Sequence, residues 1–166
     1  MKNIVLIGMP ASGKSTVGVV LAKVLGMDFL DADLVIQNRE NKKLSRIIED
    51  VGVEGFLQVE EEALLSICPN RPTVIATGGS AVYSIKGMKH LKKDALVVYL
   101  QVTLEELQKR LEDIKGRGVV VKKGQGVEDI YRERMPLYET FGEYTVSEAG
   151  KNVEDIVEEI ATFAET

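Results

Sequence analysis

The chain has 166 residues, of which 45% are hydrophobic and 28% are charged, and its formal net charge is −5 at pH 7. This composition is typical of a globular protein with a core of its own and excludes the disordered and fibrous classes, while the acidic balance argues against a nucleic-acid-binding protein. Because no apolar run reaches membrane-spanning length, we expect one domain over residues 1–166, a monomer in the cytoplasm with no membrane partner.

Short apolar segments alternate with amphipathic ones along the chain. Strands are predicted at 2–7, 28–31, 72–77, 95–101 and 144–147. Helices are predicted at 14–25, 33–40, 44–50, 53–67, 84–91, 104–113, 126–142 and 153–164. This alternation indicates an α/β fold, a parallel sheet with helices on both faces. Functional residues are therefore expected just after the strand ends.

The first strand leads directly into the segment Gly8-Met9-Pro10-Ala11-Ser12-Gly13-Lys14-Ser15-Thr16. The segment matches the phosphate-loop pattern G-x-x-x-x-G-K-[ST], with a strand before it and a helix after it. Its backbone N–H groups and the helix N-terminus favour anionic oxygens. Lys14 is expected to reach the β- and γ-phosphates of a nucleoside triphosphate, and the Ser15 hydroxyl to ligate Mg²⁺. Ala11 falls at a variable position of the pattern.

Two aspartates follow the second strand. Alternate residues of an extended strand point the same way, so Asp31 and Asp33 present two carboxylates at the edge where the phosphates are expected. In a phosphate-loop kinase one carboxylate can hold Mg²⁺, and another can orient the acceptor hydroxyl and take its proton. The alternative is that Asp33 is the N-cap of the next helix.

The third strand is followed by Gly78-Gly79-Ser80. Glycines at such a place permit a ligand to approach the backbone closely. The alternative is an ordinary turn between a strand and a helix.

A basic segment interrupts the acidic chain near its last third. Its cations and the glycines between them predict a mobile lid at about 114–126 that brings an arginine to the transferred phosphoryl group. The cations are Arg110, Lys115, Arg117, Lys122 and Lys123. The alternative is a solvated charged loop.

The chain has a single cysteine, Cys68, and a single histidine, His90. We expect the cysteine to be at least half-buried and the histidine to lie apart from it on a solvated stretch. This predicts no zinc site.

Taken together, these segments resemble the shikimate kinase family. The match runs from the phosphate loop to Arg134-Met135-Pro136-Leu137-Tyr138, and its most specific parts are Phe29-x-Asp31-x-Asp33-x-x-Ile36 and Thr77-Gly78-Gly79. The resemblance implies a three-layer αβα P-loop NTPase fold of the nucleoside-monophosphate-kinase type. It also implies an ATP-dependent kinase that uses MgATP and phosphorylates a hydroxyl of a small polyol, with shikimate as the leading candidate.

The resemblance implies roles for single residues as well. Lys14 would contact the phosphates, Ser15 and Asp31 would hold the metal, and Arg110 would lie by the adenine. Arg117 would be the lid arginine, so that the catalytic residues would be Lys14, Asp33 and Arg117. The acceptor-binding helices would span about 33–67, and the acceptor site would comprise Asp33, Leu57, Gly78, Gly79, Ser80 and Arg134, with Arg134 on the substrate carboxylate.

The chain departs from the family pattern on the acceptor side. Val53 replaces a glutamate, Leu57 replaces the arginine that is the second partner of the carboxylate, and Ser80 replaces a third glycine. Gly118 replaces a proline after the lid arginine. Because an arginine–carboxylate pair is a charge-assisted contact, losing one costs about 1.5–3 kcal/mol, and we expect weakened shikimate binding.

Two other functions remain open at this stage. A nucleoside monophosphate kinase needs several arginines for the acceptor phosphate, yet residues 34–66 contain only Arg39 and Arg46. A non-catalytic nucleotide-binding module or GTPase-like switch would be favoured by an Asn-Lys-x-Asp motif, whose aspartate is missing from Asn41-Lys42-Lys43-Leu44.

Overall fold

The computed structural model describes residues 1–112 and 125–166, which form a five-stranded parallel sheet of order β2-β3-β1-β4-β5. The strands are β1 (Asn3–Ile7), β2 (Asp28–Asp31), β3 (Thr73–Ala76), β4 (Ala95–Gln101) and β5 (Tyr144–Ser147). In the middle of the sheet, Val5 of β1 lies opposite Ile75 of β3 and Val97 of β4. The predicted parallel sheet is confirmed, and the predicted strand ends lie within one residue of the observed ones.

The helices of the described ranges are α1 (Lys14–Leu25), α2 (Ala32–Glu40), α3 (Leu44–Ser66), α4 (Ile85–Lys92), α5 (Leu104–Glu112), α6 (Val127–Phe141) and α7 (Val153–Glu165). A short 3₁₀ helix, η1 (Ala81–Tyr83), was not predicted. Gly52 interrupts α3 with φ of 75°, which matches the predicted break between helices at 44–50 and 53–67. That conformation suits glycine, which has no Cβ to clash.

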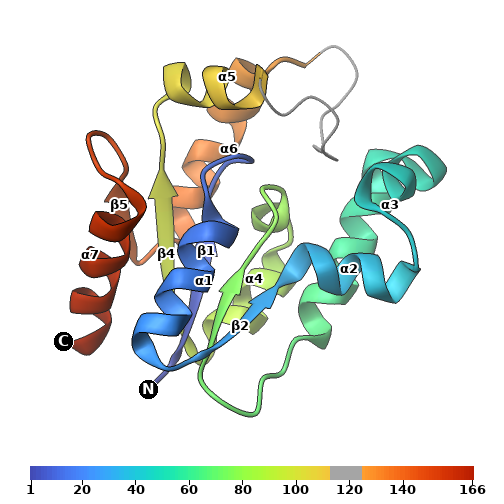
Figure 1. Cartoon of the computed structure of the whole chain (residues 1–166). Coiled ribbons are helices and arrows are strands. Elements are labelled where there is room, and N and C mark those ends of the chain that lie inside the picture. Colours follow the sequence, from blue (N-terminus) through green and yellow to red (C-terminus); the bar gives the residue numbers. More distant parts are fainter. Residues whose placement is uncertain (113–124) are drawn as a thin grey trace.

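Helices cover both faces of the sheet (Figure 1). Ile4 and Leu6 of β1 point to the face covered by α1 and α7, whereas Val5 and Ile7 point to the face where α3, α4 and α6 contribute core residues. This alternation is that of a strand buried on both sides. The structure therefore has the three αβα layers that the sequence predicted.

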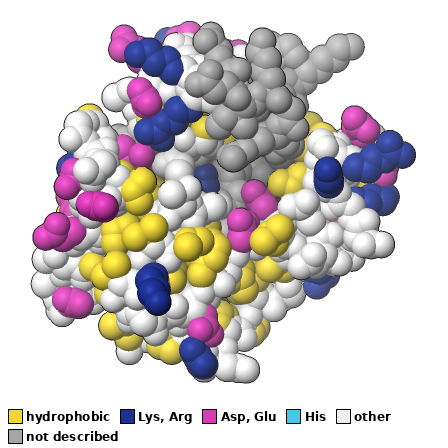
Figure 2. Space-filling view, viewed as in Figure 1, with side chains coloured by type: hydrophobic (Ala, Val, Ile, Leu, Met, Phe, Trp, Pro, Cys, Tyr) yellow, Lys and Arg dark blue, Asp and Glu magenta, His cyan; other side chains and the backbone are white. Residues whose placement is uncertain are grey.

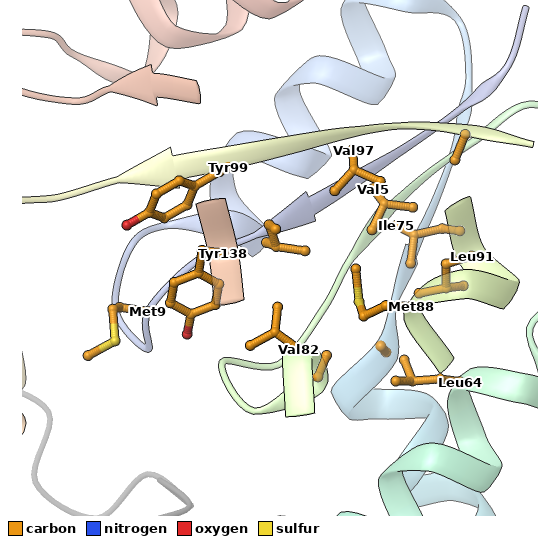
Figure 3. Close-up of a cluster of buried hydrophobic side chains, with 14 of the residues drawn as sticks. Val5, Met9, Leu64, Ile75, Val82, Met88, Leu91, Val97, Tyr99 and Tyr138 are labelled. Carbon is orange, nitrogen blue, oxygen red and sulfur yellow. The ribbon is translucent and has the colours of Figure 1, made fainter. Parts of the chain in front are cut away.

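The core on the second face also orders helix α6, which carries Arg134. Tyr138 of α6 stacks on Tyr99 of β4 with ring centroids 5.1 Å apart, and Figure 3 shows these rings side by side near Met9 of the phosphate loop. The Tyr138 hydroxyl donates a hydrogen bond of 2.6 Å to the Gly79 carbonyl. A buried stacked pair therefore ties α6 to the loop after β3.

Helices α2 and α3 project to one side of the sheet (Figure 1). They share a small apolar cluster of their own, formed by Ile36, Ile47, Phe56 and Ala63. The two helices are thereby held as one unit beside the ends of β2 and β3.

On the face shown in Figure 2, acidic and basic side chains are interspersed, and hydrophobic ones gather over α1. Among the described residues, no helix is both long enough and apolar enough to cross a lipid bilayer.

Candidate active site

The phosphate loop connects β1 to α1 at the carboxyl end of the central strand. Gly13 precedes the helix with φ of 86°, in the left-handed region that glycine adopts without strain. At Gly8 a side chain has no room, since a Cβ would lie 2.8 Å from the Leu100 carbonyl oxygen of β4. Gly13 thus allows a left-handed turn, and Gly8 allows the chain after β1 to pass close to β4.

The middle of the loop is a tight turn over Met9-Pro10-Ala11-Ser12. The Ser12 N–H donates to the Met9 carbonyl at 3.1 Å, with Pro10 and Ala11 at the central positions and Ala11 at φ of 66°. Proline followed by a left-handed residue is the pattern of a type II turn, in which glycine is favoured at the second central position. Ala11 therefore stands in a conformation that costs an L-residue about 1–2 kcal/mol, although its position in the motif is variable.

Lys14 is turned back into the loop. Its ammonium group donates to the carbonyls of Gly8 and Met9, both at 2.7 Å, and only 7% of the residue is exposed. Burial lowers the pKa of Lys14 from 10.5 to about 8, with Asp33 opposing and Arg134 adding to the shift. A positive charge is thus fixed where the motif places phosphate oxygens.

Ser15 and Asp31 meet beside the loop, with the Ser15 hydroxyl donating to Asp31 Oδ2 at 3.2 Å. The other oxygen of Asp31 accepts from the Asp33 N–H at 2.9 Å, which makes Asp31 the N-cap of α2. The alternative of Asp33 as N-cap is therefore wrong, because Asp33 already lies within the first turn. Two oxygens of the kind that Mg²⁺ prefers lie together here.

Gly78 and Gly79 lie under side chains from three helices. A Cβ on Gly78 would lie 2.6 Å from Asp33 Oδ1 and 3.1 Å from Glu60 Oε2. A Cβ on Gly79 would lie 3.0 Å from a terminal nitrogen of Arg134. Side chains of this protein thus lie close to both glycines. The approach of a ligand to this backbone stays a prediction.

Glu60 is a buried acid of α3 that the sequence analysis did not assign to the site. Only 2% of it is exposed, and Ser80 donates a hydrogen bond of 2.6 Å to Glu60 Oε1. Burial raises the pKa of Glu60 from 4.5 to about 7; Ser80 and Arg134 oppose this shift and Asp33 adds to it. In the sequence Glu60 sits beside Glu61 and Glu62 on a helix, and nothing there separates it from surface acids.

Arg134 of α6 reaches the same place from the opposite side. It is 1% exposed, its Nε donates to the Tyr83 hydroxyl at 3.3 Å, and its guanidinium carbon lies 5.2 Å from the centre of the Tyr83 ring. Such cation–π and hydrogen-bond contacts hold a guanidinium in one orientation. Arg134 is therefore oriented by the protein itself.

A cavity of about 530 Å³ joins the two halves of the site. Its walls include Lys14 and Ser15 of α1, Asp33 of α2, Gly79 after β3, and Arg134 of α6. The structure thus brings the predicted phosphate-side and acceptor-side residues around one space large enough for small ligands.

Other predicted site residues do not line this cavity. Leu57 packs against the apolar cluster of α2 and α3 and is not among the cavity-lining residues. Arg110 donates to the Ala11 carbonyl at 3.0 Å and so lies against the outside of the phosphate loop. Arg117 and most of the predicted lid lie outside the described residues.

The expectations that Cys68 is at least half-buried and that His90 lies apart from it are wrong. Cys68 is exposed, and its sulfur lies 3.8 Å from His90 Nε2, because the loop after α3 passes α4. That nitrogen also lies 2.8 Å from the Ile67 carbonyl oxygen. Among the described residues, no group of three or more His, Cys, Asp or Glu side chains could hold a metal ion.

Comparison with known proteins gives consistent matches over nearly the whole chain. The family model described as shikimate kinase matches residues 10–165. A shikimate kinase from Thermodesulfovibrio yellowstonii is 36% identical, over 96% of this chain and 93% of its own. The structure of shikimate kinase from Acinetobacter baumannii in complex with shikimate superposes with a TM-score of 0.90 at 31% identity, covering 99% of this chain and 93% of that one. For the shikimate kinase of Aquifex aeolicus the TM-score is 0.81, at 29% identity and with 98% and 96% covered.

Replacing Glu60 by glutamine should remove a pH dependence of stability. The folded protein keeps a proton on Glu60 up to a pKa of about 7, whereas an unfolded chain releases it near 4.5. Glu60 therefore lowers the free energy of unfolding as the pH rises between these values, by about 3 kcal/mol in total. Urea unfolding from pH 4 to 8 without nucleotide should show Glu60→Gln gaining stability over the wild type across this range.

The matched control is Glu62→Gln, an exposed acid on the same helix. Its stability should differ from the wild type by a constant amount across the range. If Glu60→Gln behaved in the same way as this control, the inference of a protonated buried Glu60 would be wrong.

Proposed function

Because the chain belongs to the shikimate kinase family, we propose that it transfers the γ-phosphoryl group of ATP to a hydroxyl group of shikimate. That it is an ATP-dependent phosphotransferase acting on a hydroxyl group follows from its family. Shikimate as the acceptor is supported by the relatives, which are shikimate kinases, and by the A. baumannii structure, which holds that compound. The alternatives, a nucleoside monophosphate kinase or a non-catalytic module, are not favoured.

The observation that carries the proposal is the pairing of charges across one cavity. Lys14 stands on the phosphate side, while Asp33 and Arg134 stand on the acceptor side, and all three line the same space. In this space Asp33 favours the charged form of Lys14 and so raises its pKa, whereas Arg134 lowers it. Phosphoryl transfer requires that the phosphate, the general base and the residue that binds the acceptor lie close together.

On the phosphate side, the loop binds ATP through backbone N–H groups and the N-terminus of α1. Lys14 then exchanges the carbonyls of Gly8 and Met9 for phosphate oxygens, where it stabilises the charge that develops during transfer. Ser15 and Asp31 would hold Mg²⁺, because their adjacent oxygens match its ligand preference. The bound ion would neutralise charge on the phosphates.

On the acceptor side, Asp33 accepts the proton of the attacking hydroxyl. The hydroxyl oxygen forms a bond to the γ-phosphorus as the bond from phosphorus to the bridging oxygen breaks, and ADP leaves. Arg134, held by Tyr83, binds the acceptor carboxylate. Gly78, Gly79 and Ser80 line the same cavity beside the acceptor.

The family resemblance implies two further roles. Arg117 would reach the transferred phosphoryl group from the lid, and Arg110 would lie by the adenine. We also propose that the protein works as one domain, as a monomer and in the cytoplasm, without nucleic-acid or membrane partners.

The direct test is acceptor-dependent ADP release. We expect release to be slow with ATP alone, to rise with shikimate, and not to rise with AMP. Lys14→Ala, purified in the same way and checked for folding by circular dichroism, should show no shikimate-dependent release, since the phosphate charge then lacks its partner. Stimulation by AMP instead of shikimate would contradict the proposed acceptor.

Asp33→Asn should suppress transfer while sparing ATP binding. Asparagine keeps the shape of the side chain but cannot take the hydroxyl proton, and general-base catalysis contributes about 10²–10⁴-fold. Turnover should fall by about that factor, while nucleotide affinity measured by calorimetry should change less than about threefold.

Asp28→Asn is the control, an exposed aspartate at the start of the strand that precedes Asp33, and its turnover should equal that of the wild type. Because Asp31 and not Asp33 caps α2, loss of a cap cannot explain a slow Asp33→Asn variant. Retained turnover in Asp33→Asn would remove Asp33 from the role of base.

Leu57→Arg should improve shikimate binding. The family pattern has a second arginine at this position, three residues before Glu60 on α3, so the new guanidinium would share the helical face of that acid. The KM for shikimate should fall by about ten- to a hundredfold if the arginine reaches the carboxylate.

Leu65→Arg provides the comparison, since Leu65 is exposed and lies on the same helix. Its KM for shikimate should stay at the wild-type value. A wild-type enzyme that already binds shikimate tightly, and that Leu57→Arg does not improve, would show that one arginine suffices here.

A further inference from the structure

Glu60 of α3 lies directly behind the wall of the cavity. It is not among the residues that line the cavity, but its carboxyl group reaches over Gly78, which is, and Asp33 reaches the same place from α2. Arg134 of α6 reaches over the next residue, Gly79. A buried acid with no assigned role therefore lies beside the proposed base and near the residue proposed to bind the acceptor carboxylate.

The surroundings of Glu60 favour the neutral form of its carboxyl group. The residue is 2% exposed, and within the described residues its hydrogen-bond partner is the hydroxyl of Ser80, which donates to Oε1 at 2.6 Å. Burying a carboxylate beside a second one, with a neutral hydroxyl as donor, is costly. Burial raises the pKa of Glu60 to about 7, and the negative charge of Asp33 adds to this rise. The Ser80 hydroxyl and the positive charges of Arg134 and Lys14 oppose it.

The residue at position 57 decides which cation can balance Glu60. Leu57 lies three residues before Glu60 and packs against the apolar cluster of α2 and α3. The arginine that the family pattern has at this position would share a helical face with Glu60. On the acceptor side of this protein, an ionised Glu60 and an acceptor carboxylate would therefore both depend on the charge of Arg134.

We propose that Glu60 is a positioning residue for acceptor binding, which as a neutral acid leaves the charge of Arg134 to the acceptor carboxylate and takes up a proton from water when the acceptor binds above neutral pH. The inference rests on the proposed function, in which Arg134 binds the carboxylate of shikimate. That contact neutralises Arg134, whose charge otherwise favours the ionised form of Glu60. Glu60 then holds its proton more tightly, so by linkage shikimate binds more weakly at a pH where Glu60 is ionised.

Calorimetric titration of the nucleotide-free protein with shikimate, in two buffers of different ionisation enthalpy, counts the protons taken up on binding. At pH 7.5 the wild type should take up about half a proton more than Glu60→Gln, because a tenfold rise in the proton affinity of Glu60 transfers about that amount. Lys14, with a pKa of about 8, titrates nearby, but its contribution remains in the variant. The difference between the two proteins therefore measures Glu60.

The affinity for shikimate gives a second readout. From pH 6.5 to 8.5 the Kd should rise by a factor about fivefold larger in the wild type than in Glu60→Gln. Glu61→Gln is the matched control, since Glu61 is the next residue, also accepts from a serine, Ser84, at 2.6 Å, and does not line the cavity. It should behave as the wild type in both measurements.

Leu57→Arg tests the same proposal without altering Glu60. The new cation should keep Glu60 ionised, so the proton uptake on shikimate binding should fall to the level of Glu60→Gln. If Glu60→Gln does not fold, Leu57→Arg takes its place in both comparisons with the wild type.

Equal proton uptake in the wild type and in these two variants would overturn the proposal. So would a wild-type Kd for shikimate that changes with pH no more than that of Glu60→Gln. A wild type that does not bind shikimate would instead overturn the proposed function, whereas binding without the extra proton would overturn only the role of Glu60.

Discussion

The site depends on how one buried positive charge, the ammonium group of Lys14, is held at the end of the central strand. Taking an ammonium out of water is costly, and the protein offsets this cost with two loop carbonyls at 2.7 Å and with the negative potentials of Asp33 and Glu148. The remaining cost appears in the pKa of about 8 for Lys14. Phosphate oxygens would reduce this desolvation cost, so the burial of Lys14 in the free protein favours nucleotide binding.

The acceptor side is organised by glycines that leave no space for a Cβ. Asp33 and Glu60 reach over Gly78, and Arg134 reaches over Gly79, so that side chains from α2, α3 and α6 meet at a single stretch of backbone after β3. Ser80 fits in this stretch because its hydroxyl donates to buried Glu60. The stacked pair of Tyr99 and Tyr138 fixes α6 to the sheet, and with it the position of Arg134.

Much of this arrangement was predictable from local patterns, and the rest depends on contacts between distant segments. The apolar composition of residues 2–7 predicts a buried strand, and the spacing in residues 8–16 predicts a phosphate loop. The break between two helices at Gly52 was predictable from the sequence as well. The residue type does not show whether a side chain is buried, however, so Glu60 and Glu148 could not be distinguished from surface acids in the sequence. The alternative that Asp33 caps α2 was wrong, and Asp31 is the cap, because helix starts are uncertain by a residue or two in any sequence. The Cys68–His90 contact joins residues 22 apart and left no local signal.

The measurement that tests the central claim most directly is a crystal structure of the protein with Mg²⁺ and a non-hydrolysable ATP analogue. The account predicts that Lys14 Nζ leaves the carbonyls of Gly8 and Met9 and contacts the β- and γ-phosphates, with the terminal phosphate facing Asp33. A structure in which the analogue binds elsewhere while Lys14 still donates to those two carbonyls would contradict it.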